Sequence, residues 1–456
     1  MHNENARNDA RNAAAPAPSG DDPHDPRRLV PPALAREIAA RFGTPCFVYS
    51  QPALERRADA ALAFPNAFGL TARFAMKALP NAAVLRLFDR RGLHFDASSG
   101  FEARRAILAG VAPAKISLST QELPADIAAL LDAGVTVNAC SLSQLERLGE
   151  AARRRAGTGT PLEIGIRVNP GRGSGGTGKT NVGGPDASFG VWHEYLGDAL
   201  ALAAGAGLRV TRLHTHIGSG SDPLVWQQVA VASLELARRM PEVATLNLGG
   251  GYKVARVTGE KETDLQTVGA PVRDAFVRFA AETGRRLRLE IEPGTFLVAN
   301  CGVLLATVQD VTDTGVGGRR FLKLDSGMTE LLRPSLYGAQ HPVAVVAQWE
   351  RGAGSGERGD SADFIVVGHC CESGDLVTCA AGEPETLSAR ALPAATRRGD
   401  LLLIGGCGAY CSAMSAKNYN SFPEAPEVLA GTDGVARLIR RRQTLEQIIA
   451  NEVAPE

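Results

Sequence analysis

Residues 71–97 read TARFAMKALPNAAVLRLFDRRGLHFDA and hold one complete strand–helix–strand unit. The runs 71–79 and 93–97 are short and apolar, as in buried strands, whereas residues 81–91 place their apolar side chains at helical spacing. Two strands joined by a helix are expected to lie parallel in one sheet, because a parallel pair needs a crossover connection. The fold therefore depends on how often this unit recurs.

The unit recurs as far as residue 294. Further strands are predicted at 115–119, 135–139, 163–170, 208–218, 243–250 and 287–294. Further helices are predicted at 101–110, 122–133, 142–155, 194–206, 224–239 and 270–284. Eight strands alternating with helices over about 230 residues are typical of a (β/α)8 barrel, with a doubly wound sheet as the alternative.

After about residue 300 the pattern changes to apolar runs separated by Gly, Asp and Pro turns, which predicts a mainly β domain. The runs are VLLATVQDV (303–311), FLKLDSG (321–327), DFIVVG (363–368) and DLLLIGG (400–406). The earlier run CFVYS (46–50) is expected to join them. We therefore predict a disordered tail at 1–32, a barrel domain at 33–305 and a C-terminal β domain at 306–456.

The composition excludes several classes of partner. Lys+Arg and Asp+Glu both number 49, so the balance of charge gives no reason to expect nucleic acid or a membrane surface. No apolar run approaches the ~20 residues of a membrane span, and the N-terminus lacks an apolar signal core. None of the eight cysteines forms a C-x-x-C pair, so a reduced, cytoplasmic protein is expected.

Residues 173–180, GSGGTGKT, match the phosphate-loop pattern of nucleotide triphosphatases. That motif needs a helix beginning at its Lys, yet NVGGPDASFG (181–190) follows, with three Gly and one Pro. The match is therefore attributed to a glycine-rich loop after the fifth strand, where barrel enzymes place loops that cover the substrate.

Charged side chains stand at the carboxyl ends of three predicted barrel strands, where barrel enzymes place their functional groups. Lys77 ends the first strand, and a lysine whose pKa is lowered by burial can form a Schiff base with an aldehyde. Asp96 ends the second strand and Arg167 the fifth, and either could instead belong to a core ion pair. Lys77 is thus the candidate nucleophile.

Two later strands end in residues that suit an aromatic, phosphorylated cofactor. His214 and His216 lie two apart and so face one side of a strand, but no set of acidic residues with ligand spacing accompanies them, and an imidazole can stack on a ring. The glycines at 249–251 let backbone amides approach an anion, and Glu292 could keep a pyridine nitrogen protonated. With Lys77, these residues predict a pyridoxal 5'-phosphate site.

From about residue 33 to 451 the chain resembles the fold-type III pyridoxal phosphate decarboxylases, and among them the diaminopimelate decarboxylases. The motifs in the barrel are FAMKA (74–78), FDASSGFE (95–102), HTHIGSG (214–220), GGG (249–251) and EPG (292–294). The resemblance implies that Lys77 carries the cofactor, His216 stacks on its ring and Glu292 pairs with its nitrogen. The other residues expected at the cofactor are Asp96, Ser99, Glu102, Arg167, Ser219, Gly249, Gly250, Gly251 and Tyr410.

Three motifs of the second domain extend the resemblance: LRPSLYGAQH (332–341), GHCCESGD (368–375) and GAYCSAMSAKNYN (408–420). By resemblance, Arg333 and Tyr337 grip the far carboxylate of the substrate. Cys371 and Glu372 are expected to reach the active site of a partner subunit, the thiol near the reacting carbon and the carboxylate near the second ammonium. The implied molecule is a homodimer with shared active sites. Each chain would be a (β/α)8 barrel with a C-terminal β-sandwich or β-barrel domain, an alanine racemase-like fold.

The chain departs from the family pattern at two positions. The family usually has Arg directly after E-P-G, whereas this chain has Thr295, so two charge-assisted hydrogen bonds to phosphate or substrate are missing. Either another cation substitutes, or the substrate carboxylate is recognised differently. Relatives also often carry Lys before Phe-Gly, where this chain has Ser188.

The resemblance implies decarboxylation of meso-diaminopimelate to L-lysine, with Lys77, His216 and Cys371 as catalytic residues and Thr295 facing the substrate. Arg333, Tyr337 and the Cys-Glu-Ser triplet favour a substrate with both a distal amine and a distal carboxylate. One alternative is a related decarboxylase for another, or a carrier-bound, amino acid. The others are a non-catalytic regulatory barrel protein that binds the cofactor, and a racemase, which would need a catalytic Tyr in place of GHCCESGD.

Overall fold

The computed structural model of the chain describes residues 22–154, 161–171, 183–216, 218, 222–348 and 360–454. The chain divides into two compact units. The barrel unit comprises residues 55–254 and 261–297, and the β unit comprises the chain up to residue 54, residues 255–260 and residues 298–456.

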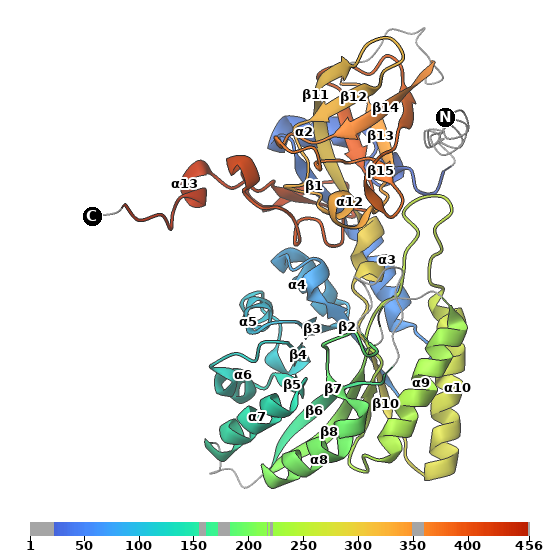
Figure 1. Ribbon diagram of the computed structural model, residues 1–456, viewed down its shortest axis with the longest axis vertical. Helices are drawn as coiled ribbons and strands as arrows, with labels where there is room; N and C mark the ends of the chain where they lie inside the picture. The colour runs from blue at the N-terminus through green and yellow to red at the C-terminus, as the bar shows by residue number, and fades with distance from the viewer. Residues whose placement is uncertain are drawn as a thin grey trace, which may run out of the picture. The chain divides into compact units, whose positions relative to one another are not determined.

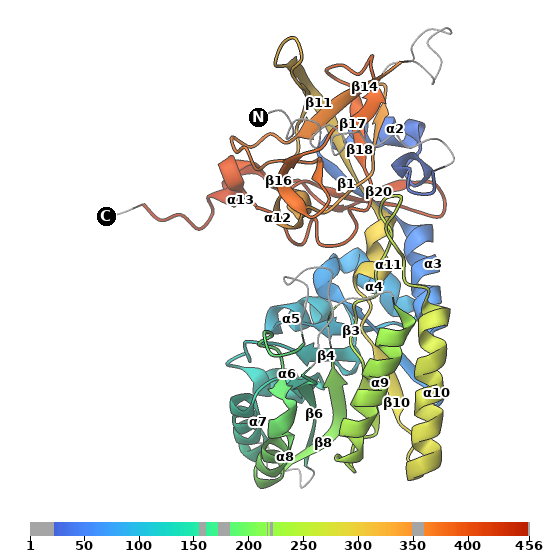
Figure 2. The ribbon, with the colours of Figure 1, turned by 45° about the vertical axis from the view of Figure 1, so that its right-hand side comes forward.

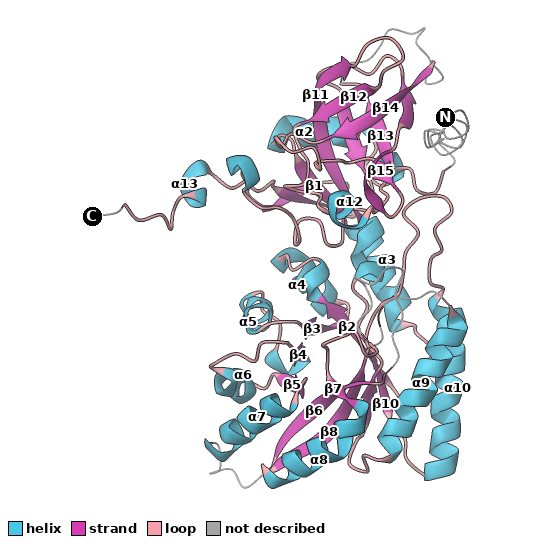
Figure 3. Cartoon of the chain, viewed as in Figure 1, coloured by secondary structure: helices cyan, strands magenta, loops and turns pink. Residues whose placement is uncertain are grey.

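The barrel unit is built on eight parallel strands that close into a ring. Around the ring the order is β5-β4-β3-β2-β10-β9-β8-β6, and pairing of β6 with β5 completes it (Figures 1 and 3). The strands are β2 (Leu70–Ala75), β3 (His94–Ala97), β4 (Ile116–Ser119), β5 (Thr136–Ala139), β6 (Leu162–Asn169), β8 (Leu208–Thr215), β9 (Thr245–Asn247) and β10 (Arg288–Ile291). All eight lie within or beside their predicted ranges, and closure confirms the barrel over the doubly wound sheet.

Helices flank the strands on the outside of the barrel (Figure 2). They are α4 (Ala82–Arg90), α5 (Gly100–Leu108), α6 (Ile127–Ala133), α7 (Leu142–Arg154), α8 (Leu196–Gly205), α9 (Pro223–Arg238) and α10 (Leu265–Thr283). Helix α10 begins five residues earlier than predicted, because the side chain of Asp264 caps its first turn by accepting hydrogen bonds from the amides of Gln266 and Thr267. Pro271 therefore lies inside the helix rather than at its start. In the described part of the chain, no helix is both long and apolar enough to cross a membrane.

The inside of the barrel holds a buried cluster of charge. Arg73 on β2 forms a two-point ion pair with Glu290 on β10, with N–O distances of 2.9 and 3.1 Å. Arg212 on β8 brings Nε to 3.2 Å from the same carboxylate. Burial raises the pKa of a carboxyl group, but the two guanidinium groups outweigh it, so the pKa of Glu290 is lowered. The carboxylate is ionised and ties three strands together.

The β unit is a separate sheet with a helix packed on it (Figure 3). Strand β1 (Cys46–Ser50) lies between β11 (Gly302–Asp313), its antiparallel neighbour, and β19 (Glu427–Ala430), its parallel neighbour. The other strands of this sheet are β12 (Arg320–Leu324), β13 (Val343–Val346), β14 (Ser361–Val367), β17 (Arg390–Pro393), β18 (Leu401–Ile404) and β20 (Ala436–Arg440). Apolar residues of α2 (Pro32–Phe42) pack against β1, β11 and β18 to form the core.

The buried ion pair predicts an unequal response to arginine replacement. Arg73→Leu leaves Glu290 with Arg212 alone, and breaking a buried pair in this way is expected to lower the free energy of unfolding by about 3 kcal/mol. Arg209→Leu is the matched control, because Arg209 also lies on a barrel strand and pairs with two carboxylates, but at the surface, where the cost is about 0–1 kcal/mol. Urea unfolding measures the free energy of unfolding of both variants. Equal losses would show that the buried ion pair contributes no more to stability than the exposed one.

Candidate active site

Glu292 follows β10 directly and is a buried carboxylate contacted by two side chains. Asn247, at the end of β9, donates from Nδ2 to Oε1 over 2.6 Å, and His214 on β8 brings Nε2 to 3.3 Å from Oε2. Burial alone raises the pKa of a carboxyl group, but the interaction with the His214 imidazole and the Asn247 hydrogen bond outweigh it, so the pKa of Glu292 is lowered. Glu292 therefore stays negatively charged inside the barrel.

The contacts of Glu292 continue across the barrel. Nδ1 of His214 lies 3.3 Å from the hydroxyl of Ser119 on β4, and that oxygen accepts a hydrogen bond of 2.9 Å from Nδ2 of Asn138 on β5. Asn247, Ser119 and Asn138 were not singled out from the sequence. Each is a polar residue near the end of an otherwise apolar strand, and that position is the signal that could have identified it.

His216 follows β8 and packs against the glycine run. Gly249 has φ +74°, and a Cβ atom there would lie 2.5 Å from Nδ1 of His216, so the contact requires glycine. Nδ1 is buried and has no hydrogen-bond partner among the described residues. Burial, and then the charge of Arg167, lower the pKa of His216 well below its ordinary value, so the imidazole is neutral. The described residues include no group of three or more His, Cys, Asp or Glu placed to hold a metal ion.

The rest of the glycine run lies against the backbone at the end of β10. The amide of Glu292 donates to the carbonyl of Gly249 over 2.8 Å, and a Cβ atom on Gly250 would lie 2.1 Å from the carbonyl oxygen of Glu292. Gly251 has φ +103°, which disfavours any larger residue. The glycines therefore let this turn pack closely against the backbone at the end of β10.

Asp96 and His216 each lie within electrostatic reach of both Lys77 and Arg167. Lys77 is exposed in a single 3-10 turn, η2 (Met76–Ala78), immediately after β2. Asp96 is the last residue but one of β3, and its Oδ1 is buried without a hydrogen-bond partner among the described residues. Burial, the largest cause, raises the pKa of Asp96, whereas the charges of Lys77 and Arg167 oppose that change. The structure thus brings these four predicted residues together at the carboxyl ends of the strands.

Ser99 and Glu102, also expected near the cofactor, cap helix α5. The hydroxyl of Ser99 accepts a hydrogen bond of 3.1 Å from the amide of Glu102. The Glu102 carboxylate accepts one of 2.7 Å from the amide of Ser98. The charge of Glu102 also raises the pKa of Asp96, so this cap lies at the edge of the same group. Ser219 and the motif at 173–180 lie outside the described residues.

Asn169, at the end of β6, joins the two sides of segment 172–182. Its Oδ1 accepts hydrogen bonds from the amides of Gly171 and Gly184, at 3.1 and 2.9 Å. Its Nδ2 donates to the carbonyl of Gly184 over 2.9 Å. One side chain therefore holds both Gly171 and Gly184 at the end of β6.

Arg167 also lies near an aromatic ring, and Thr295 is the last predicted barrel residue to be placed. Arg167 lies on β6 with its guanidinium carbon 5.1 Å from the ring centroid of Phe189, just beyond segment 172–182. Ser188 accepts a hydrogen bond of 3.1 Å from Nε2 of Gln121. Thr295 begins the short helix α11 (Thr295–Val298) and is half-buried.

In the β unit, Cys371 and Glu372 belong to a loop that Asp375 fixes. The Asp375 carboxylate is buried and accepts hydrogen bonds from the amides of Met328 and Cys370, at 2.6 and 2.8 Å. Cys371 and Glu372 are themselves exposed. A firmly held loop thus presents a thiol and a carboxylate to the outside of the β unit.

Arg333 and Tyr337 open and close a short helix, α12 (Arg333–Tyr337), with the guanidinium carbon 5.7 Å from the tyrosine ring centroid. Nε of Arg333 is buried without a hydrogen-bond partner among the described residues. Tyr410 has φ +54°, a left-handed conformation that costs a residue other than glycine about 1 kcal/mol. The surrounding structure therefore holds Tyr410 in place against that preference.

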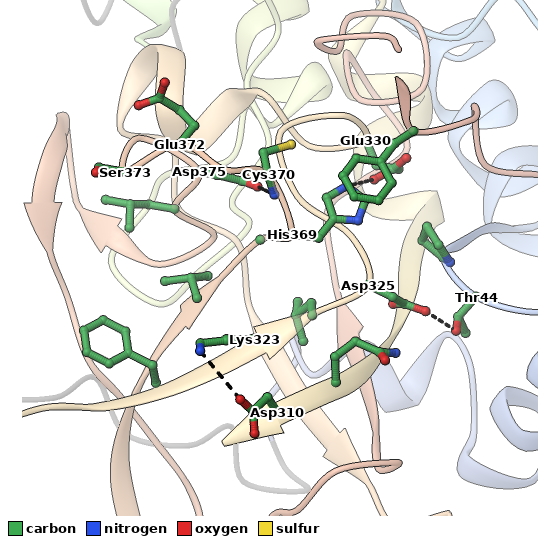
Figure 4. A pocket seen from close by; sticks show the side chains of 18 of the residues that line it. Thr44, Asp310, Lys323, Asp325, Glu330, His369, Cys370, Glu372, Ser373 and Asp375 are labelled. Carbon is green, nitrogen blue, oxygen red and sulfur yellow. Dashed lines mark hydrogen bonds and ion pairs between the residues drawn. The ribbon is translucent and has the colours of Figure 1, made fainter. Parts of the chain in front are cut away.

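The β unit also contains a cavity of about 1020 Å³ with acidic side chains around it (Figure 4). Glu330 lies in its wall, and Oε2 accepts hydrogen bonds from the hydroxyls of Thr329 and Ser326, at 2.7 and 3.0 Å. Oε1 is buried without a partner among the described residues, and burial raises the pKa of Glu330 to about 7. His369 stacks on Phe422 beside it, with ring centroids 3.6 Å apart.

Comparison with protein families places a known domain over most of the barrel. Residues 54–299 match the family described as pyridoxal-dependent decarboxylase, pyridoxal binding domain. The chain is 36% identical over 449 residues to a diaminopimelate decarboxylase of Streptomyces coelicolor, and the match covers 96% of this chain and 95% of that one.

Solved structures agree with the sequence comparison. A crystal structure of a diaminopimelate decarboxylase superposes with a TM-score of 0.83 at 34% identity, and the match covers 92% of this chain and 96% of that one. The diaminopimelate decarboxylase of Helicobacter pylori, solved with L-lysine bound, superposes with a TM-score of 0.79 at 26% identity, covering 91% and 98% of the two chains. Both likenesses extend over nearly the full length of the solved chains.

The buried Glu330 predicts a specific pH dependence of stability. Because its folded pKa, about 7, exceeds the ordinary value of 4.5, the folded chain holds a proton that the unfolded chain has released between these pH values. The free energy of unfolding should therefore fall as pH rises from 4.5 to 7, by up to about 3 kcal/mol from this group. Urea unfolding of Glu330→Gln at pH 5 and pH 8 should show a smaller fall than the wild type.

Glu372→Gln is the control for this experiment, because Glu372 is an exposed carboxylate of the same cavity. It should keep the wild-type difference between the two pH values. The same pH dependence in Glu330→Gln and the wild type would contradict a raised pKa of Glu330.

Proposed function

Since this chain belongs to the diaminopimelate decarboxylase family of pyridoxal-dependent decarboxylases, we propose that it converts meso-diaminopimelate into L-lysine and CO2. The family predicted from the motifs is confirmed, and with it a pyridoxal phosphate-dependent carboxy-lyase of lysine biosynthesis. The observation that carries the proposed reaction is the buried carboxylate of Glu292, held ionised at the same end of the barrel as Lys77.

The barrel residues suit pyridoxal phosphate. Oδ1 of Asp96 and Nδ1 of His216 are buried and lack partners among the described residues, so a bound ligand could satisfy both. The glycine run has no side chains to keep a phosphate from its backbone amides, and the exposed Lys77 can reach an aldehyde with its amine. When bound, pyridoxal phosphate supplies a protonated ring that accepts an electron pair.

Each residue has a separate task in this proposal. Lys77 would hold the cofactor at its aldehyde group through Nζ, and the neutral ring of His216 would lie against the pyridine. Glu292, kept negative by His214 and Asn247, would keep the pyridine nitrogen protonated. The remaining contacts to cofactor and phosphate are assigned to Asp96, Arg167, Ser219, Gly249, Gly250, Gly251 and Tyr410.

The β unit supplies groups for the far end of the substrate. Arg333 and Tyr337 are assigned to the distal carboxylate, Glu372 to the distal ammonium, and Cys371 to proton return at the reacting carbon. Because Cys371 and Glu372 are exposed on a fixed loop, they are available to complete the site of a second subunit. The functional molecule is therefore proposed to be a homodimer with shared sites.

The reaction is tested by measuring CO2 release from meso-diaminopimelate, lysine, ornithine and arginine with the cofactor-loaded protein. Strong preference for meso-diaminopimelate is expected. Lys77→Ala should reduce release to background and remove the absorbance band of the bound cofactor. Activity on another amino acid only would overturn the proposed substrate and identify Thr295 as the mark of a changed pocket, in favour of a related decarboxylase.

Shared sites predict complementation between two inactive variants. After subunit exchange, a mixture of Lys77→Ala and Cys371→Ala should regain about a quarter of the wild-type rate, because half of the dimers are hybrids and each has one intact site of two. Lys77→Ala mixed with itself is the control. No recovery, with exchange proven by mass spectrometry of tagged subunits, would contradict a site that draws Lys77 and Cys371 from different chains.

A further inference from the structure

Two arginines and one histidine of the β unit each have a buried side-chain nitrogen atom without a hydrogen-bond partner among the described residues. These atoms are Nη2 of Arg256, Nε of Arg333 and Nε2 of His341. Buried polar groups without a partner are rare in folded proteins, so three in one unit call for an explanation.

Arg256 and His341 contact successive carbonyl groups of one turn. Nδ1 of His341 lies 2.8 Å from the carbonyl oxygen of Gly405, and Nε of Arg256 donates to the carbonyl oxygen of Gly406 over 3.2 Å. Gly406 has φ +67°, and a Cβ atom there would lie 2.8 Å from Cδ of Arg256, so glycine allows the arginine to lie against the turn. With Nδ1 donating to Gly405, the neutral imidazole offers Nε2 as an acceptor to a neighbouring guanidinium.

Arg256 is 8% exposed, and burial followed by the charge of Arg333 lowers its pKa to about 10. Cys411, Glu260 and Cys407 oppose this change without reversing it. Glu260 is near, but its Oε2 accepts from the backbone amide of Arg256, at 2.7 Å. Two guanidinium groups that repel each other in a buried site are stabilised when an anion binds between them.

We propose that Arg256 and Arg333 together bind the distal carboxylate of the substrate, with His341 positioning the two guanidinium groups. This inference rests on the proposed function and adds Arg256 to its specificity-determining residues. Where the family usually has an arginine after E-P-G, this chain has Thr295, and Arg256 is a cation that can supply the missing charge. A phosphate is the other anion with this chemistry, and the experiment separates the two.

The test compares two ligands that differ only in the carboxylate. L-lysine and cadaverine share both amines, but only L-lysine carries the carboxylate, and calorimetry on the cofactor-loaded protein gives the Kd of each. Arg256→Gln should raise the Kd of L-lysine about 10- to 100-fold, because hydrogen bonds to a charged group contribute that much to affinity. The Kd of cadaverine should change less than about 2-fold. The KM for meso-diaminopimelate should rise with the Kd of L-lysine.

Two further variants show whether a change in Kd comes from lost binding or from lost folding. Arg390→Gln is the matched control, because Arg390 is equally buried in the β unit but donates to Ser388 and Gln340, and it should leave both Kd values unchanged. Arg256→Lys keeps the charge without the planar fork and should give an intermediate Kd for L-lysine. Should Arg256→Gln not fold, an unchanged Kd in Arg256→Lys would overturn the proposal.

The other possible outcomes separate the carboxylate from the phosphate and this inference from the proposed function. If Arg256→Gln weakens pyridoxal phosphate binding, measured by titrating the apoprotein, and leaves the Kd of L-lysine unchanged, the anion is the phosphate and the carboxylate assignment is wrong. If neither the affinity for pyridoxal phosphate nor the Kd of L-lysine changes, the two arginines only stabilise the β unit and the proposal is wrong. A wild type that decarboxylates meso-diaminopimelate while Arg256→Gln keeps its KM rejects only this inference. A wild type that neither acts on meso-diaminopimelate nor prefers L-lysine to cadaverine rejects the proposed function.

Discussion

The barrel depends on keeping two carboxylates ionised in its interior. Glu290 and Glu292 lie two residues apart at the end of β10, so their side chains leave the strand on the same side. An isolated charge in such a place is costly and would become neutral, unless opposite charge or hydrogen bonds hold it. Much of the polar interior described above meets that requirement.

The two carboxylates are held differently, and the difference separates stability from chemistry. Two guanidinium groups surround Glu290, so its charge is fully matched and it serves to join strands. An imidazole and an amide contact Glu292, which leaves a net negative charge available to a ligand. The layer of Glu290 thus joins strands, whereas the proposed reaction belongs to the layer nearer the carboxyl ends of the strands.

Local pattern sufficed for the fold. Eight strands could be predicted because each is short and apolar and all but the last precede a helical stretch, but the start of α10 could not, since Asp264 caps it ahead of Pro271. Pairings between distant strands, such as Asn247 with Glu292, leave no local signal. Arg256 was missed for the same reason, because nothing in KVARVTGE marks a buried arginine.

The hydrogen bonds from Asn169 to both Gly171 and Gly184 have an evolutionary consequence. Since one side chain fixes Gly171 and Gly184, the strands do not depend on what joins these two residues. With Gly171 and Gly184 held, a longer chain between them would cost little, because the entropy of closing a flexible loop grows only with the logarithm of its length. Relatives can therefore differ in the number of residues between these two positions, and a new sequence can be inserted there, while the barrel keeps its register.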